Sequence, residues 1–287
     1  MRINNEWINY KILATGNGQK LEQFGDLILL RPDPQVIWNS QFNLSEYKGL
    51  SAIYENGCVS EQGSWKKLKS VPDSFTIEWR NLKFSLKLMK FKHTGIFPEQ
   101  AYNWNRMIEL IKNSNRNIKV LNLFAYTGGA TLACASAGAS VCHVDAARAM
   151  GERAGFNAKL SGLANASIRY IIDDCVTFVE REIRRGHKYD AIIMDPPAYG
   201  RGPRGELWKI QDQIYSLVEL TRNILSDNPL FHLINSYATG LLPSAMANIQ
   251  RLVFKGFNGM IESYEIGIAT KETSIILPCG ASSMTIF

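Results

Sequence analysis

The feature that most constrains the fold is an alternation of short apolar runs with longer segments of helical spacing, which begins at Val120. Repeated strand and helix units predict a mostly parallel sheet with helices on both faces. The expected strands cover residues 120–124, 140–144, 168–172, 191–194, 230–234 and 260–268, and the expected helices cover residues 130–137, 146–160, 175–185, 210–225 and 244–254.

The first 90 residues follow a different pattern, which is typical of short strands. Apolar residues alternate from Phe75 to Trp79 and again from Leu82, and the slip at Arg80-Asn81 predicts a two-residue hairpin turn. Residues 27–30 and 49–54 are also expected to be strands. We therefore expect a small β-rich domain over residues 1–90 and an α/β domain over residues 91–287, which opens with a helix over 99–112.

Composition excludes several classes of protein. With 46% hydrophobic and 20% charged residues, and no apolar run near the roughly 20 residues of a membrane span, the sequence is that of a globular protein. Residues 1–7 lack the pattern of a secretory signal, so a cytoplasmic protein is expected. The five cysteines form no C-x-x-C pair and predict reduced thiols rather than a metal site.

A basic strip lies between residues 65 and 92, where eight Lys or Arg residues face only two acids, Asp73 and Glu78. Such a strip suits a polyanion such as RNA, although a solvated strand face would look the same. A second basic segment, residues 200–205, could bind RNA or serve as a lid. The candidate phosphate contacts are Lys66, Lys67, Lys69, Arg201 and Arg204.

The most informative motif is the strand at 120–124 followed by a loop that ends in Gly128-Gly129 and then a helix of small residues. A strand that opens into a glycine loop brings a nucleotide-like ligand against backbone N–H groups. The G-x-G-x-x-G spacing that a dinucleotide pyrophosphate requires is absent, which disfavours an NAD-dependent dehydrogenase. A cofactor without phosphates, such as S-adenosylmethionine (SAM), remains suitable, as does a turn without function.

Acids follow the next two strands. Asp145 ends the second strand, where a carboxylate can accept hydrogen bonds from both ribose hydroxyls. The third strand ends in Asp173-Asp174, of which one could accept the adenine amino group while the other caps the next helix. We favour Asp174 for the adenine. Each acid alone could be only a helix cap, but their succession indicates a ligand site.

The fourth strand ends in Asp195-Pro196-Pro197-Ala198-Tyr199. Two prolines stop the strand and stiffen the loop, and their carbonyl oxygens remain as acceptors. Asp195 and the Pro196 carbonyl could hold the hydrogens of an amine so that its lone pair faces a methyl donor. Tyr199 could stack on a nucleobase that has left its helix. A structural Asp-Pro-Pro turn is the alternative.

Together with residues 92–100 (Lys-His-Thr-Gly-Ile-Phe-Pro-Glu-Gln), these motifs resemble the SAM-dependent methyltransferase family that includes the bacterial large-subunit ribosomal RNA methyltransferases acting on cytosine C5 and guanine N7. The resemblance covers about residues 75–287 and implies a Rossmann-like sheet with an antiparallel last strand. It also implies that Phe97 and Gln100 contact SAM. The candidate cofactor contacts are Phe97, Gln100, Asn122, Phe124, Ala125, Tyr126, Thr127, Gly128, Asp145, Ala146, Asp173, Asp174 and Asp195, and the candidate catalytic residues are Asp195, Pro196, Pro197 and Tyr199.

The expected thiol of a cytosine C5 enzyme is missing from this sequence. Methylation of a pyrimidine carbon needs a cysteine that adds to the ring, but Ala198 follows the prolines and residues 235–237 are Asn-Ser-Tyr. The sequence therefore predicts methyl transfer to a nitrogen of RNA, with ribosomal RNA as the expected substrate. Methylation of a protein or small molecule, and a non-catalytic SAM-binding RNA module, remain open alternatives.

Overall fold

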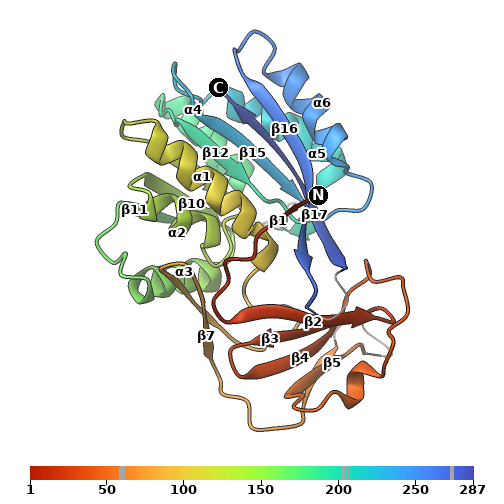
Figure 1. The fold of residues 1–287 in the computed structure, drawn as a ribbon. Helices are drawn as coiled ribbons and strands as arrows, with labels where there is room; N and C mark the ends of the chain where they lie inside the picture. The colour runs from red at the N-terminus through yellow and green to blue at the C-terminus, as the bar shows by residue number, and fades with distance from the viewer. Residues whose placement is uncertain (58–62, 202–204, 206, 272–274) are drawn as a thin grey trace. The chain divides into compact units, whose positions relative to one another are not determined.

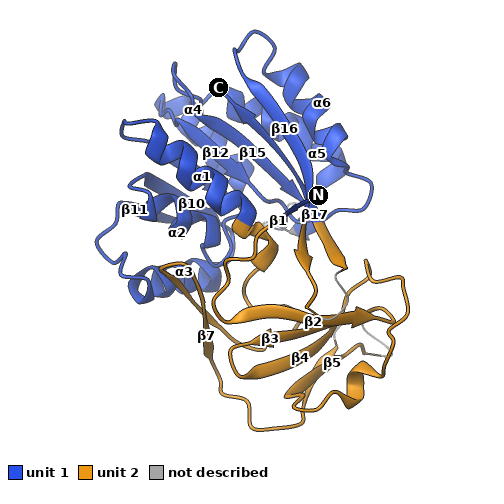
Figure 2. Cartoon of the chain, in the orientation of Figure 1, with its two compact units in different colours: residues 1–2, 102–266, 280–287 blue, residues 3–101, 267–279 orange. Residues whose placement is uncertain are grey.

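The chain forms two compact units, coloured separately in Figure 2, and neither unit is one continuous segment. Unit 1 comprises Met1–Arg2, Tyr102–Ile266 and Gly280–Phe287, and unit 2 comprises Ile3–Ala101 and Gly267–Cys279. This computed structural model describes residues 1–57, 63–201, 205, 207–271 and 275–287. The division of the chain at residues 90 and 91 into two domains stays a prediction.

Unit 1 is built on an eight-stranded sheet (Figure 1) with the order β1-β16-β17-β15-β12-β9-β10-β11. Strands β9 to β12 and β15 run parallel to their neighbours in that group, and β17 runs antiparallel to β15. The expected Rossmann-like sheet with an antiparallel last strand is confirmed. The strands are β1 (Arg2–Ile3), β9 (Lys119–Leu123), β10 (Ser140–Asp145), β11 (Ile168–Ile172), β12 (Ala191–Met194), β15 (Phe231–Ser236), β16 (Met260–Ala269) and β17 (Ile276–Ile286).

Helices cover both faces of this sheet. Phe178 of α4, Ile214 of α5 and Met246 of α6 share one buried cluster with the sheet residues Leu121 and Ile192, which places these helices on one face. Helices α1 to α3 lie on the other face (Figure 1). Their bounds are α1 (Ala101–Asn113), α2 (Gly129–Ser136), α3 (Arg148–Leu160), α4 (Cys175–Arg185), α5 (Ile210–Arg222) and α6 (Pro243–Val253). None of the described helices is long and apolar enough to span a bilayer.

The parallel register brings the carboxyl ends of four strands to one edge of the sheet. Leu123 of β9 lies beside Val144 of β10 and Met194 of β12, and Asp145 of β10 lies beside Ile172 of β11. The loops after these strands carry the candidate site residues of unit 1. Ligands of open α/β sheets bind at this edge.

Unit 2 contains a five-stranded sheet in the order β2-β3-β4-β5-β6 and a separate hairpin, β7-β8. Its interior includes an ion pair in which Arg31 Nε lies 2.6 Å from Glu22 Oε2. Arg80 has a φ of 51° in the β7-β8 turn, where a hairpin is expected from sequence. The elements are β2 (Tyr10–Gly16), β3 (Gln19–Phe24), β4 (Leu27–Pro32), β5 (Ala52–Glu55), β6 (Ser64–Lys67), β7 (Phe75–Trp79), β8 (Leu82–Leu86) and the 3-10 helices η1 (Leu44–Glu46) and η2 (Pro98–Gln100).

Candidate functional site

The loop between β9 and α2 has an unusual backbone. Phe124 and Tyr126 have φ values of 54° and 50°, and Gly128, the N-cap of α2, has a φ of 92°. Left-handed conformations of non-glycine residues cost about 1–2 kcal/mol each and concentrate at ligand sites. At Gly128 a Cβ would lie only 2.9 Å from the Cβ of Ala154 in α3, so only glycine fits there. The loop is therefore held in a strained shape at the sheet edge where ligands bind.

Asp145 ties this loop to the end of β10. Its Oδ2 accepts a hydrogen bond from the backbone N–H of Tyr126, and its Oδ1 accepts one from Ala147, both at 2.8 Å. Burial raises the pKa of the Asp145 carboxyl, and the two backbone donors oppose that shift. Each carboxylate oxygen has a second lone pair, so the group can still accept hydrogen bonds from a ribose diol. Ala146 follows Asp145 in the chain, and the Ala125 N–H donates to the carbonyl of the preceding residue, Val144, at 3.1 Å.

The two acids after β11 make different contacts within the protein. Asp174 is the N-cap of α4, and its Oδ1 accepts a hydrogen bond from the Thr177 N–H at 2.8 Å. Asp173 forms an ion pair with Arg181 and accepts a hydrogen bond from the Asp174 N–H. Asp174, which we favour for the adenine, is thus also the capping residue, and the cap uses only its Oδ1. Which acid contacts the adenine stays a prediction.

Two other candidate cofactor contacts are buried and form hydrogen bonds within the protein. Asn122 and Thr127 are each only 2% exposed. The Asn122 amide donates to Thr131 Oγ1 at 2.9 Å, and the Thr127 carbonyl accepts from the Asn157 amide at 3.0 Å. These bonds help to fix the position of the loop, and contacts of Asn122 and Thr127 with a cofactor stay predictions.

The Asp-Pro-Pro turn after β12 is clamped by a residue that sequence reasoning missed. Trp208 lies in β14 (Leu207–Lys209), which pairs with β13 (Tyr199–Arg201) in a two-stranded ribbon. Its Nε1–H donates to the Pro197 carbonyl at 2.7 Å, and its ring lies 5.2 Å from that of Phe124. The Pro197 carbonyl thus already accepts one hydrogen bond within the protein, and its role toward a substrate stays a prediction. The signal for Trp208 in the sequence is a tryptophan that closely follows the glycine-rich residues 200–205.

The other candidate residues of this turn differ in exposure, and their roles stay predictions. Asp195 is half-buried, Pro196 is buried, and Tyr199 is 57% exposed on the ribbon, opposite Lys209. An exposed aromatic ring beside a half-buried carboxylate can stack on a planar group while the carboxylate accepts a hydrogen bond. A thiol of the described residues at this edge, that of Cys175, is 3% exposed and lies 3.3 Å from the Phe124 nitrogen. Burial raises the pKa of the Cys175 thiol, which disfavours it as a nucleophile.

Phe97 and Gln100 belong to unit 2, whereas the other candidate cofactor residues belong to unit 1. Phe97 precedes η2, and its ring lies 5.6 Å from that of His93. Gln100 ends η2, and its N–H donates to the Phe97 carbonyl at 3.1 Å. Their contacts with a cofactor stay predictions.

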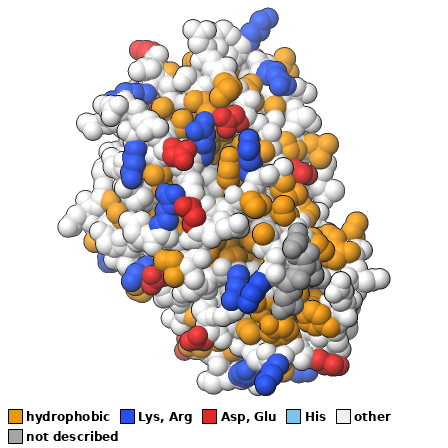
Figure 3. Space-filling model, viewed as in Figure 1, with side chains coloured by type: hydrophobic (Ala, Val, Ile, Leu, Met, Phe, Trp, Pro, Cys, Tyr) orange, Lys and Arg blue, Asp and Glu red, His pale blue; other side chains and the backbone are white. Residues whose placement is uncertain are grey.

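The candidate phosphate-binding lysines are exposed on and after β6. Lys66 lies 3.8 Å from Glu55, and Lys67 and Lys69 donate to the carbonyls of Val71 and Gly49. On the face drawn in Figure 3, Lys and Arg side chains are interspersed with Asp and Glu. Phosphate contacts by these lysines stay predictions, as does one by Arg201. Arg204 lies outside the described residues.

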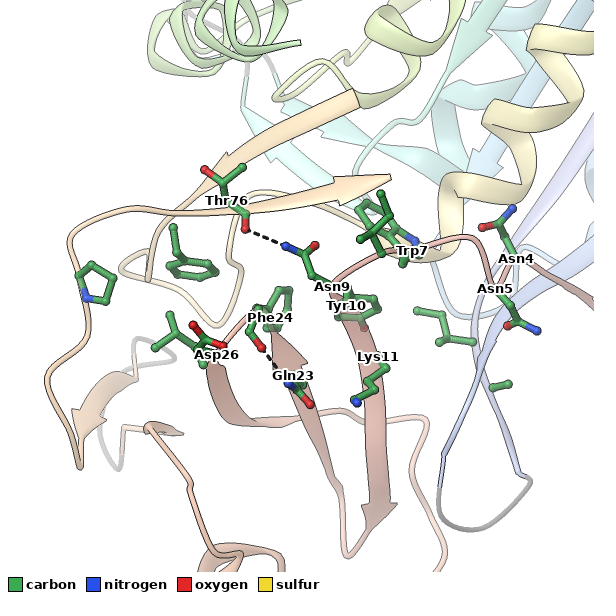
Figure 4. A pocket seen from close by; sticks show the side chains of 17 residues that line it. Asn4, Asn5, Trp7, Asn9, Tyr10, Lys11, Gln23, Phe24, Asp26 and Thr76 are labelled. Atoms are coloured by element: carbon green, nitrogen blue, oxygen red, sulfur yellow. Dashed lines mark hydrogen bonds between the residues drawn. The ribbon is translucent and has the colours of Figure 1, made fainter. Parts of the chain in front are cut away.

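Unit 2 also contains a groove of about 880 Å³, drawn in Figure 4. A row of aromatic rings, Trp7, Tyr10, Phe24 and Phe75, lies along it at centroid spacings of 5.8, 4.9 and 6.0 Å. The charged residues in its lining are one lysine, Lys11, and one aspartate, Asp26. The groove therefore has no excess of either charge.

Comparison with known proteins points to one family. The family model of S-adenosylmethionine-dependent methyltransferases matches residues 58–246. A crystal structure of a SAM-dependent methyltransferase from Agrobacterium tumefaciens is 32% identical, with a TM-score of 0.92, over 99% of this chain and 92% of that one.

Curated relatives carry more specific names. The ribosomal RNA large subunit methyltransferase K/L of Shewanella frigidimarina is 32% identical over 51% of this chain and 20% of its own length. The ribosomal RNA large subunit methyltransferase K of Neisseria meningitidis serogroup B is 24% identical over 79% of this chain and 65% of its own length. The chain thus spans less than two thirds of the length of these relatives.

Proposed function

The chain belongs to the family of S-adenosylmethionine-dependent methyltransferases, and we propose that it transfers a methyl group from SAM to a nucleobase nitrogen of RNA, with ribosomal RNA as the substrate. The observation that carries this proposal is the meeting of the strained loop 124–128, Asp145 and the Asp195-Pro196 turn at one sheet edge. The names of the curated relatives support ribosomal RNA as the substrate. Such a substrate would place the reaction in the cytoplasm.

The residues at this edge fit SAM. Gly128 leaves the start of α2 without a side chain, so backbone N–H groups can approach a ligand closely. The Asp145 carboxylate would hold the ribose, and one of the acids Asp173 and Asp174 would contact the adenine. When bound, SAM supplies a methyl group on a positively charged sulfur.

The substrate amine would be oriented by Asp195 and the Pro196 carbonyl. Both accept hydrogen bonds, so they would hold the N–H groups and leave the nitrogen lone pair directed at the methyl group. Tyr199, with its exposed ring, would stack on the base. Nitrogen rather than carbon is favoured because position 198 is alanine and the Cys175 thiol is buried, so no exposed thiol lies on the described loops of this edge.

The direct test is to incubate the protein with SAM and with ribosomal RNA from cells that lack this gene. We expect S-adenosylhomocysteine to form and one methylated nucleoside to appear in mass spectrometry, with the methyl group on nitrogen. Methyl transfer that survives RNase treatment would move the substrate to a protein or small molecule. SAM binding without S-adenosylhomocysteine would contradict an enzyme altogether.

The cofactor half of the proposal is tested by Asp145→Asn, which keeps the shape and removes the charge. A hydrogen bond to a charged group contributes about 1.5–3 kcal/mol, so SAM affinity should fall about 10- to 100-fold in calorimetry. Glu109→Gln, a charge removal at an exposed site on α1, is the matched control. Unchanged SAM affinity in Asp145→Asn would remove this carboxylate from the cofactor site.

A further inference from the structure

A hollow of unit 1 lies at the opposite edge of the sheet, where β9, β10 and β11 begin. Its volume is about 410 Å³. The polar groups around it are basic or hydroxylic, namely Lys119, Ser140, Ser167, Arg169, His187 and Lys188. Its lining contains no aspartate or glutamate, so three permanent positive charges surround one small volume.

One acid close to these cations is Asp190, which accepts a hydrogen bond from the Lys119 N–H at 2.8 Å and forms an ion pair with Arg116. Another is Glu182 of α4, whose side chain is fully buried. Its carboxylate accepts hydrogen bonds from Tyr189 at 2.7 Å, His187 at 2.9 Å and Arg185 at 3.2 Å. Arg169 lies 3.9 Å from it. Because these neighbours already satisfy Glu182, its single charge offsets only part of the positive charge around the hollow.

The other polar groups add no negative charge. Cys142 lies in the lining and is 6% exposed, and burial raises the pKa of its thiol, so it is neutral at physiological pH. Lys188 donates to the carbonyl of Asn223 at 2.8 Å, which leaves two further N–H groups of its ammonium. The hydroxyls of Ser140 and Ser167 are hydrogen-bond donors of the kind that contact phosphate oxygens.

The groove of unit 2 and this hollow of unit 1 therefore differ in charge. The larger groove in unit 2 has one lysine, Lys11, and one aspartate, Asp26, in its lining and so has no excess positive charge to attract an anion (Figure 4). The smaller hollow gathers Lys119, Arg169 and Lys188 without an acid in its lining. Charge rather than volume selects a phosphate, because cation–phosphate contacts supply most of the sequence-independent affinity of proteins for nucleic acids.

We propose that this hollow binds a backbone phosphate of the RNA substrate, away from the base that is methylated. The proposal rests on RNA being the substrate, as proposed above. Strand β10 has six residues and so spans about 20 Å from this edge to the opposite one. The RNA would thus be held at two places on unit 1, one specific for the base and one independent of sequence.

The test measures RNA binding by fluorescence anisotropy between 50 and 200 mM salt for the whole chain and three variants. Lys119→Ala and Lys188→Ala should each lower the slope of log K against log salt by about one, because each removes one phosphate contact. Affinity at low salt should fall several-fold in each. Lys11→Ala, which removes a matched exposed lysine from the lining of the groove in unit 2, should change neither quantity. Equal slopes for all four proteins would overturn the proposal.

Further arms identify the source of the phosphate. Inorganic phosphate and AMP should compete only at millimolar concentration if a polymer is the ligand, and full competition at micromolar AMP would instead indicate a mononucleotide site. A polyglutamate peptide that binds as tightly as RNA, with the same loss in the variants, would also contradict the proposal.

The experiments distinguish failure of the phosphate-binding proposal from failure of the proposed function. Methyl transfer to RNA with unchanged salt slopes in the lysine variants would refute the hollow alone. Lysine-dependent RNA binding without S-adenosylhomocysteine would refute the function alone. SAM affinity should be the same in all variants, since neither lysine is a candidate cofactor contact.

Discussion

Trp208 fixes the direction of the Pro197 carbonyl in the Asp195-Pro196-Pro197 turn. Because the indole N–H holds the Pro197 oxygen at 2.7 Å, the turn is fixed relative to Phe124 at the start of the loop 124–128. The indole thus links the proposed substrate-orienting turn to the proposed cofactor loop. It is a positioning residue, since its own hydrogen bond is already made within the protein.

Trp208→Phe removes this hydrogen bond and keeps an aromatic ring in the core. A hydrogen bond of this kind contributes about 1 kcal/mol, so kcat for methyl transfer should fall about 5-fold while KM for SAM changes little. Steady-state kinetics give both constants. Trp65→Phe is the matched control, because Trp65 Nε1 donates to the Met89 carbonyl at 2.8 Å in unit 2. An equal loss of kcat in both variants would indicate a general effect of stability instead.

Residue types and their spacing located this edge but could not give side-chain directions. Asp173 and Asp174 are adjacent acids, and only the structure shows that Asp174 caps α4 while Asp173 pairs with Arg181. Asn122 lies in a strand, where side chains alternate between the two faces of the sheet. The sequence does not show that its amide donates to Thr131. These outcomes depend on packing partners that are distant in the sequence or on the next helix, which a local pattern does not specify.

At the scale of elements, the start of α2 depends on a close approach between helices. A Cβ at Gly129 would lie 2.4 Å from Cζ2 of Trp104 in α1, and Trp104 is only 3% exposed. At Gly151 in α3 a Cβ would meet nothing within 4 Å. The two glycines therefore differ in purpose, although both stand in helices beside the proposed cofactor loop.

We expect opposite effects of the same substitution at these positions. Gly129→Ala should lower the free energy of unfolding by about 1–3 kcal/mol or more, because the buried indole must move. Gly151→Ala should raise it by about 0.5–1 kcal/mol, because alanine restricts the unfolded chain and favours the helix. Urea denaturation monitored by circular dichroism gives both values. A stabilised Gly129→Ala would show that α1 is not packed against this turn.

The strands and helices of unit 1 were largely predictable, because buried parallel strands read as apolar runs and helix ends are marked by glycine. The expected strands at 168–172 and 191–194 and the helix at 175–185 coincide with β11, β12 and α4. The hairpin of β2 and β3 was missed, although its turn is Asn17-Gly18, with φ values of 53° and 74°. An Asn-Gly pair is a strong hairpin signal. This dipeptide therefore predicts the hairpin of β2 and β3.

At the scale of the whole molecule, the sequence could not show that the units are discontinuous. Residues 267–279 belong to unit 2, where the Lys271 N–H donates to the Ile12 carbonyl at 2.9 Å. A contact between residues so far apart leaves no local pattern. The chain enters unit 2 twice, and β16 and β17 each have residues in both units.

The stability of the whole chain should depend on pH through two buried histidines of unit 1. Burial lowers the pKa of His143 from 6.5 to about 4 and that of His232 from 6.5 to about 3. Both rings are fully buried, with Nδ1 of His143 2.9 Å from Thr131 Oγ1 and Nε2 of His232 3.1 Å from Thr221 Oγ1. A histidine whose pKa is depressed by folding contributes its full stability above 6.5 and loses it as pH falls toward the folded pKa.

Between pH 6.5 and 5 the free energy of unfolding should therefore fall by roughly 2 kcal/mol for each of these two histidines. The buried carboxyls Glu22, Glu182 and Asp190, whose pKa values are lowered, contribute below this range, since their loss begins only near their unfolded pKa values of 4.5 or less. Urea midpoints at pH 5 and 6.5 measure the effect. In His232→Gln the fall in the free energy of unfolding between pH 6.5 and 5 should be smaller by the contribution of one histidine. This difference does not depend on the absolute stability of the variant. A pH dependence identical to that of the unsubstituted chain would mean that His232 titrates normally and is not held neutral by burial.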